Sequence, residues 1–205
     1  YNEACYTVYN EGDIDASGFD SDYLCKNTVI QHNYSHHNDW GGLLVCCWGT
    51  VKGSFNDGTL VKSNVFQDEK HHLIRFSGNI TNTEISNNLF VIGAKIDDVL
   101  LWYKDWGDSW PDGTLLKNNI FHNSGASRFL KLGEASNNTL SSNGLWGNPF
   151  DDYNNFVEVQ DEAALNSSIA EIRKIGARKE FSVSRAREVA AIMLPLMKFP
   201  QAGRK

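Results

Sequence analysis

A short pattern recurs along the first 150 residues: an aliphatic residue, two variable residues, an asparagine and an apolar or aromatic pair. Five copies occur, and their asparagines are Asn33, Asn64, Asn88, Asn119 and Asn143. These asparagines are 31, 24, 31 and 24 residues apart. A second apolar segment follows each of the first four copies, at 43–45, 73–76, 99–102 and 129–132. A period of this size, with short strands and turn residues between them, is typical of a solenoid.

The repeats predict an all-β solenoid rather than a helical one, because the body shows no sustained 3.6-residue period. A β-sandwich is disfavoured, since its strands would not repeat in phase. We expect a parallel β-helix of about five to six coils over residues 1–155. Asparagine tolerates the left-handed conformation, and its amide can bond the asparagine one coil above, so we place one asparagine at each tight corner.

Residues 156–205 read as an α-helical tail. Ser168 to Glu171 has the pattern of a capping box, Ile169, Ile172 and Ile175 form an apolar stripe, and Gly176 is a stop signal. A second helix is predicted from Ser184 to about Met193, with Pro195 stopping or kinking it. We expect the tail to cap an open apolar end of the solenoid. A docking arm for a partner or another domain is the alternative.

The charged residues also divide the chain into a body and a tail. The 205 residues together have a formal net charge of −6. Residues 1–155 carry 10 basic and 19 acidic residues, whereas the tail carries 9 basic and 6 acidic ones. The acidic balance argues against nucleic acid as a partner. The sequence has no apolar run of 18 residues, so we expect no membrane-spanning helix.

The chain begins at Tyr1 without an initiator Met or the features of a leader. Either a leader was removed, or the chain is a piece of a longer β-helix whose N-terminal part would then be a partner. Cys5, Cys25 and Cys46 are about one coil apart and are expected to stack as a ladder; a disulfide of Cys25 with either neighbour stays open.

When the second apolar segments of the repeats are aligned as strands of one sheet, charged residues fall on the outer face of that sheet. The inward positions are Phe19, Ser21, Tyr23, Leu43, Val45, Ile74, Phe76, Val99, Leu101, Tyr103, Leu130 and Leu132. The outward positions are Asp20, Asp22, Leu44, Cys46, Leu73, Arg75, Trp102, Lys104, Phe129 and Lys131. The Cβ atoms of Asp20 and Asp22 should lie ~6.5–7 Å apart, near the ~6.5–9.5 Å separation of the acid and base in inverting glycosidases. We therefore name both as catalytic candidates; a Ca²⁺ site with Asp13 and Asp15, or a solvated surface, is the alternative.

The turns before these strands add further candidates. Asp39 should lie about one rung, ~5 Å, from His71, an arrangement that orients a general acid or base. Arg75 would lie two rungs, ~10 Å, from the Asp20–Asp22 pair and could bind a sugar carboxylate or hydroxyl. We name Asp39 and His71 as catalytic candidates, and His37, Trp40 and Arg75 as substrate-binding candidates. Hydrogen bonding within the turns is the simpler role for the histidines.

Two of the intervals carry extra residues, near 48–58 and 97–113. The second stretch holds Trp102, Trp106 and Trp110 together with several Asp residues. Aromatic faces next to carboxylates suit pyranose rings, so these three Trp are predicted to bind substrate. A self-packed loop core is the alternative. We predict no metal site of the zinc type, because the required Cys and His spacing is missing.

The stretch from Gly18 to Cys46 resembles right-handed parallel β-helix proteins of the pectin-lyase-like superfamily, many of them secreted bacterial carbohydrate-active enzymes. The arrangement is similar to that of polygalacturonases: Gly18-Phe-Asp20-Ser-Asp22 matches the first element, Asn38-Asp39-Trp40 matches the second in part, and Lys70-His71-His72 stands in the place of the third. The resemblance implies a secreted or periplasmic glycoside hydrolase acting on a polysaccharide or oligosaccharide without a cofactor, Ca²⁺ being the one candidate ion. A polysaccharide lyase of the same fold and a non-catalytic binding or adhesin-like module are the alternatives.

Overall fold

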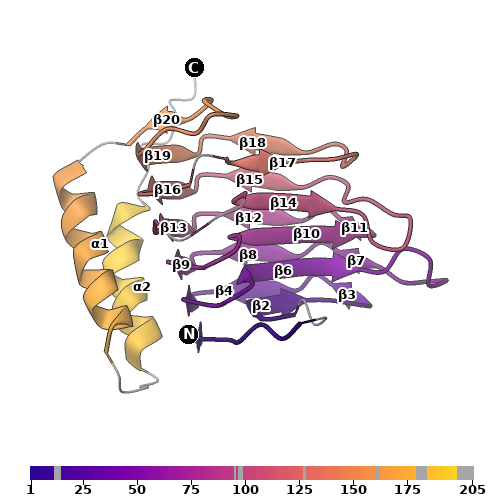
Figure 1. Ribbon diagram of the computed structural model, residues 1–205, viewed down its shortest axis with the longest axis horizontal. Helices are drawn as coiled ribbons and strands as arrows, with labels where there is room; N and C mark the ends of the chain where they lie inside the picture. The colour runs from indigo at the N-terminus through magenta and orange to yellow at the C-terminus, as the bar shows by residue number, and fades with distance from the viewer. Residues whose placement is uncertain are drawn as a thin grey trace.

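The apolar repeats form short parallel strands that wind into a right-handed β-helix, as predicted. The computed structural model describes residues 1–11, 15–94, 96, 99–126, 128–159, 162–178 and 184–197. Within this part of the chain, five complete turns are stacked on one another, the first over residues 17–36 and the last over residues 130–147 (Figure 1). One further short strand lies before the first turn and one after the last. Asp13, which we considered as a Ca²⁺ ligand, lies outside the described residues.

Four parallel sheets form the walls of the solenoid. The seven-stranded β1 sheet has the order β1 (Glu3–Cys5), β5 (Tyr34–His36), β9 (Val65–Gln67), β13 (Leu89–Ile92), β16 (Ile120–Asn123), β19 (Gly144–Gly147) and β20 (Val157–Glu158). The β2 sheet contains β2 (Ser17–Ser21), β6 (Gly41–Cys47), β10 (Ile74–Gly78), β14 (Leu101–Lys104) and β17 (Leu130–Lys131). The β4 sheet contains β4 (Val29–Gln31), β8 (Leu60–Lys62), β12 (Glu84–Ser86), β15 (Leu115–Lys117) and β18 (Thr139–Ser141). The fourth sheet is a narrow wall of three strands, β3 (Cys25–Lys26), β7 (Asn56–Asp57) and β11 (Ile80–Thr81).

The repeated asparagines form a continuous hydrogen-bonded ladder between the β4 and β1 sheets. The backbone N–H and the side-chain Nδ2 of Asn64 both donate to Oδ1 of Asn88, at 2.9 and 3.1 Å. The same pair of bonds joins Asn33 to Asn64, Asn88 to Asn119 and Asn119 to Asn143. Asn2 adds a further member, which the repeat analysis did not identify.

The left-handed conformation falls one residue earlier than we predicted. The residues with positive φ are His32, Ser63, Asn87, Asn118 and Ser142, each directly before a ladder asparagine. The preceding residue therefore turns the backbone, and the asparagine supplies the amide that bonds the next coil. Asparagine is favoured at the ladder position for its two-sided hydrogen bonding rather than for its backbone freedom.

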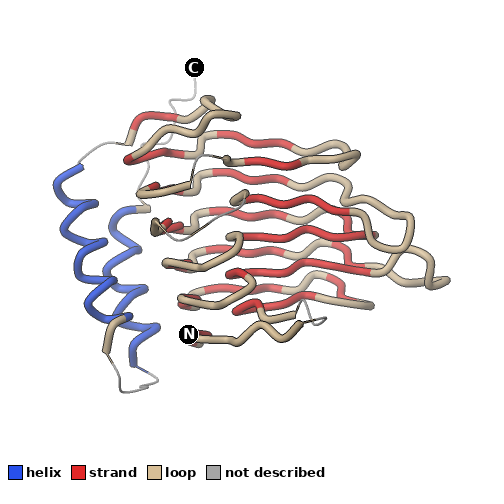
Figure 2. Tube along the Cα trace, in the orientation of Figure 1, coloured by secondary structure: helices blue, strands red, loops and turns tan. Residues whose placement is uncertain are grey.

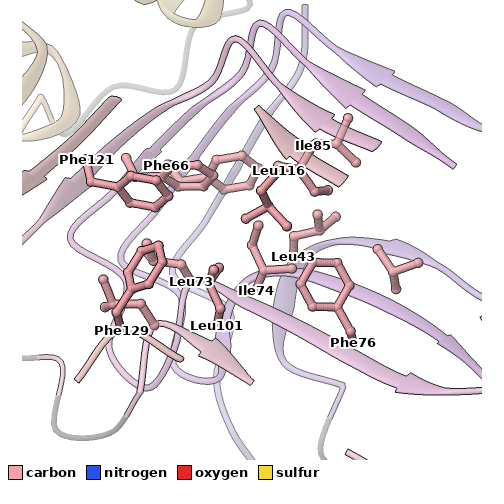
Figure 3. Packing of buried hydrophobic residues seen from close by; sticks show 14 of the residues in the cluster. Leu43, Phe66, Leu73, Ile74, Phe76, Ile85, Leu101, Leu116, Phe121 and Phe129 are labelled. Carbon is pink, nitrogen blue, oxygen red and sulfur yellow. The ribbon is translucent and has the colours of Figure 1, made fainter. Parts of the chain in front are cut away.

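The parallel strands form the walls of the solenoid (Figure 2). Stacked aliphatic and aromatic side chains fill its interior (Figure 3). The rings of Phe66 and Phe90 stack at 5.2 Å, and those of Phe90 and Phe121 at 4.8 Å. At the C-terminal end of the stack, Phe129 contacts Phe150 and Tyr153, at ring distances of 5.0 and 4.9 Å. A loop of aromatic residues thus covers this end of the interior.

The tail forms α1 (Glu162–Gly176) and α2 (Ser184–Leu196). We expected the helices to cover an open end, but they lie along the side of the solenoid, against the β1 sheet (Figure 1). They pack there because that sheet has an apolar outer row, made by Tyr34, Val65, Leu89, Val91 and Ile120. Ser168 lies inside α1 rather than capping it, because the helix begins at Glu162. Among the described residues, no helix has the length and apolarity needed to cross a membrane.

The four cysteines are free thiols and form no ladder. Cys5 lies opposite His36 in the β1 sheet, Cys25 opposite Asn56 in the narrow wall, and Cys46 opposite Ser77 in the β2 sheet. Their spacing of about one coil is therefore misleading, since coil lengths differ and each Cys falls on a different wall.

Candidate carbohydrate-binding face

The predicted register of the outer face is correct for the central row of the β2 sheet. Parallel pairing aligns Asp20, Leu44, Arg75, Trp102 and Lys131 across the five strands. Their neighbours Phe19, Leu43, Ile74, Leu101 and Leu130 belong to the interior cluster or pack against it. The alternation therefore turns the charged row outward.

Three residues depart from this alternation. Leu73 and Phe129, which we expected to face outward, are fully buried in the interior cluster. Tyr23, which we expected to face inward, is 37% exposed. All three lie just outside a strand, where the two-residue alternation no longer applies.

Two carboxylates meet at the β2 edge of the face. One oxygen each of Asp20 and Asp22 and the Sγ of Cys46 lie within 4.8 Å of one another. The Cys46 thiol is 3.3 Å from Asp22 Oδ1 and donates to it. Desolvation by the surrounding protein, followed by repulsion from Asp22 and Asp15, raises the pKa of Asp20 to about 7, although its side chain reaches solvent. Asp20 therefore holds a proton near neutral pH, in contrast to an ordinary aspartate.

This cluster is a poor match for the Ca²⁺ site considered above. Calcium takes 6–8 oxygen ligands, whereas a buried thiol occupies one side of the pair. Burial and the nearby Asp20 raise the pKa of Cys46, so its sulfur stays protonated. A second cluster of Glu3, Cys5 and His36 has its carboxylate occupied by His36 and by Arg185.

Arg75 and Trp102 form the centre of the face. Arg75 is 4% exposed, and its guanidinium carbon lies 5.2 Å from the centroid of the Trp102 ring. Its Nη2 lies 3.5 Å from Ser77 Oγ. Burial is the main cause that lowers the pKa of Arg75, and the nearby Cys46 and Asp15 oppose this effect.

Asp39 and His71 do not form the pair that we predicted. Asp39 Oδ1 accepts a short hydrogen bond from Lys70 Nζ, and Oδ2 accepts from the backbone N–H of Tyr9 at 3.0 Å. The hydrogen bond from Lys70 is the main cause that lowers the pKa of Asp39. His71 instead lies over Trp40, with ring centroids 4.2 Å apart. The predicted contact across one rung therefore exists, but it joins Asp39 to Lys70, the residue just before His71.

Trp40 joins the face through the two histidines of the next coil. Its ring lies 6.0 Å from that of His72, which in turn lies 5.9 Å from Trp102. Desolvation holds the pKa of His72 well below its ordinary value, so the buried ring is neutral. Tyr9 stacks on the other side of Trp40 at 4.6 Å. The structure therefore places Trp40, His71 and Trp102 in one aromatic group.

The two other tryptophans of the 97–113 stretch, Trp106 and Trp110, have different surroundings. Trp106 stacks with Trp48 at 5.8 Å and contacts Tyr23, the neighbour of Asp22, at 5.5 Å. Trp110 lies against Gly133, where an added Cβ would contact its ring. Trp106 thus borders the carboxylate end of the face, whereas Trp110 packs against a glycine turn.

His37 lies elsewhere, at the corner between the β1 and β2 sheets. It lines a cavity of about 320 Å³ together with Asp68, Glu69, Lys70, Gly93, Ala94 and Arg173. Glu69 is buried, accepts hydrogen bonds from Ser35 Oγ at 2.6 Å and from the Asn38 N–H at 2.8 Å, and has its pKa raised to about 8 by desolvation. Glu69 is not among the residues predicted from the sequence, although its position 31 residues after Asn38, one long coil, was an available signal.

Comparison with known proteins found a partial similarity. The chain is 29% identical over 124 residues to a lacto-N-biosidase of Bifidobacterium longum subsp. longum. The aligned segment covers 60% of this chain and 7% of that protein, so the chain spans a small part of its relative. No protein-family model and no solved structure matches the chain. The pectin-lyase-like superfamily stays a prediction, and the partial similarity to a glycoside hydrolase hints at a carbohydrate-active protein.

Proposed function

We propose that this chain forms the substrate face of a glycoside hydrolase and that an oligosaccharide or polysaccharide lies across the outside of the β2 sheet. The observation that carries the proposal is the Asp20–Asp22 pair, whose oxygens lie within 4.8 Å of each other. Asp20 belongs to the same outer row as Arg75 and Trp102. The partial similarity to a lacto-N-biosidase supports the same class of reaction.

Asp20 acts as the general acid. A carboxyl group with a pKa of about 7 is protonated in roughly half of the molecules at neutral pH and can deliver that proton to the glycosidic oxygen. Asp22 is the second carboxylate that such hydrolysis requires, and the Cys46 thiol holds one of its oxygens in place. Arg75 on β10 and Trp102 on β14 bind the sugar farther along the sheet, and Trp106 borders the carboxylate end.

Asp39 and His71 take a supporting role in this proposal. Both oxygens of Asp39 are occupied, by Lys70 and by the Tyr9 amide. His71 packs on Trp40 and fixes the aromatic edge of the face. Proton transfer is therefore assigned to Asp20 and Asp22 alone.

The test is sugar release from a panel of polysaccharides and oligosaccharides that includes lacto-N-bioside glycosides. Asp20→Asn and Asp22→Asn should each lower kcat/KM by about 10²–10⁴-fold. Asp151→Asn is the matched control, because Asp151 is exposed at the far end of the solenoid. Circular dichroism of each variant verifies that it is folded.

Two other outcomes would replace the proposal. Formation of an unsaturated uronide, followed by its ultraviolet absorbance, would show a polysaccharide lyase. Binding of saccharides without cleavage of any of them would show a binding module. In both cases the roles given to Asp20 and Asp22 would be wrong.

A further inference from the structure

Three cations from neighbouring strands converge on the ring of Trp102. The guanidinium of Arg75 (β10) and the Nζ of Lys131 (β17) each lie 5.2 Å from its centroid, and the Nζ of Lys104 (β14) lies 5.7 Å from it. None of the three forms an ion pair with a carboxylate in the part of the chain that the structure describes. Like charges gathered without a direct ion pair repel one another, and the ring face and the more distant Asp15 offset this only in part.

Unpaired polar atoms lie buried at the same place. The Nε of Arg75, both ring nitrogens of His72 and the Nε1 of Trp40 have no hydrogen-bond partner among the described residues. His72 is fully buried and Arg75 is 4% exposed. Buried polar groups normally have partners, and a cluster of them without any indicates a site that a ligand completes. Arginine Nε and tryptophan Nε1 only donate, so the matching ligand is rich in acceptors.

We propose that Arg75, Trp102, Lys104 and Lys131 form an anion subsite, which binds a carboxylate or sulfate group carried by the saccharide. The inference rests on the proposed function and names the substrate class of that site. Guanidinium and ammonium groups bind such oxyanions through charge-assisted hydrogen bonds. The Trp102 ring holds the three cations close together.

The opposite charges at the two ends of the face determine where the carboxylate or sulfate of the saccharide lies. Asp20 and Arg75 occupy the same row two rungs apart, roughly 10 Å. A negative group is repelled by the carboxylate end of the face, mainly by Asp22, and attracted at the anion subsite. The substrate therefore carries its charge away from the cleaved bond, and a chain charged at every residue is disfavoured.

Isothermal titration calorimetry with the full chain carrying Asp22→Asn, a change expected to prevent cleavage of the probes, tests the subsite independently of hydrolysis. The probes are a neutral tetrasaccharide ending in lacto-N-biose and the same tetrasaccharide with a single sulfate or a single glucuronate. At least one charged form should bind about tenfold more tightly than the neutral form, since charge-assisted hydrogen bonds are worth about 1.5–3 kcal/mol. This preference should weaken as salt is added. The sulfated and glucuronate forms, compared side by side, show which anion the subsite accepts.

The double variant Lys104→Gln/Lys131→Gln should remove most of the preference by weakening binding of the charged forms, with Arg75 left to supply the rest. Both lysines are exposed, so the variant should fold, whereas Arg75 is buried. Lys26→Gln/Lys62→Gln makes the same charge change on other walls and should keep the preference. Equal binding of neutral and charged probes, or no binding of the charged ones, overturns the subsite. Charged preference without hydrolysis would retain the subsite and overturn only the proposed function.

Discussion

Arg185 of α2 forms a buried ion pair with Glu3 of β1, in which Nη2 lies 3.0 Å from Oε1. The two side chains are 2% and 10% exposed. The same oxygen of Glu3 lies 2.8 Å from His36 Nε2, and Arg185 also donates to the carbonyls of Gly176 and Arg178. One guanidinium therefore joins the end of α1, the start of α2 and the first strand of the solenoid.

Arg185→Met should lower the free energy of unfolding by about 3–5 kcal/mol, because it leaves the buried Glu3 carboxylate without a positively charged partner, since the adjacent His36 is neutral. Urea unfolding followed by circular dichroism measures the change. Arg187→Met on the same helix is exposed and should change stability by about 0.5 kcal/mol or less. Equal effects of the two substitutions would show that the ion pair does not hold the tail in place.

Asn88→Ala should break the asparagine ladder at its centre. The buried N–H of Asn64 loses its acceptor, and leaving such a group unpaired costs about 1–3 kcal/mol. Asn154→Ala, at an exposed loop position, is the control and should be close to neutral. Thermal unfolding compares the two, and a stable Asn88→Ala protein would mean that the ladder contributes little beyond the backbone bonds.

Asp20→Asn should make the protein more stable at high pH. The pKa of Asp20 rises from 3.8 to about 7 on folding, so between these values the folded state keeps a proton that the unfolded state has lost. Stability conferred by that proton is present below pH 3.8 and is lost as pH rises through about 7. The variant should therefore have a higher Tm than wild type above pH 7 and the same Tm below pH 3.8. A Tm difference that does not change with pH would exclude the raised pKa.

The reaction should retain the anomeric configuration. Asp20 and Asp22 offer oxygens within 4.8 Å, which is nearer the ~5–5.5 Å spacing of retaining enzymes than the ~6.5–9.5 Å of inverting ones. The Cβ spacing along an extended strand had indicated the inverting range, but the side chains converge on Cys46. Proton NMR of the first product formed decides the matter, and an inverted product would require a water between more distant groups.

Short-range patterns in the sequence predicted the solenoid, the register of the outer row and the two helices. The spacing of Asn33, Asn64 and Asn88 predicted their stacking because every coil must return the chain to the same corner. The alternation in β6 and β10 predicted that Leu44 and Arg75 share a row, since side chains in a strand point alternately to its two faces. The stripe of Ile169, Ile172 and Ile175 predicted a helix with one apolar face.

Tertiary structure alone decided what each of these elements contacts. The tail lies on the β1 sheet instead of an end because Val65, Leu89 and Ile120 give that wall an apolar outer row, while Phe150 and Tyr153 cover the C-terminal end. Asp39 pairs with Lys70 rather than His71 because a turn, unlike a strand, has no fixed direction for its side chains. Local sequence determines the period and the face of an element, but the partner across a turn or a wall depends on how whole coils pack.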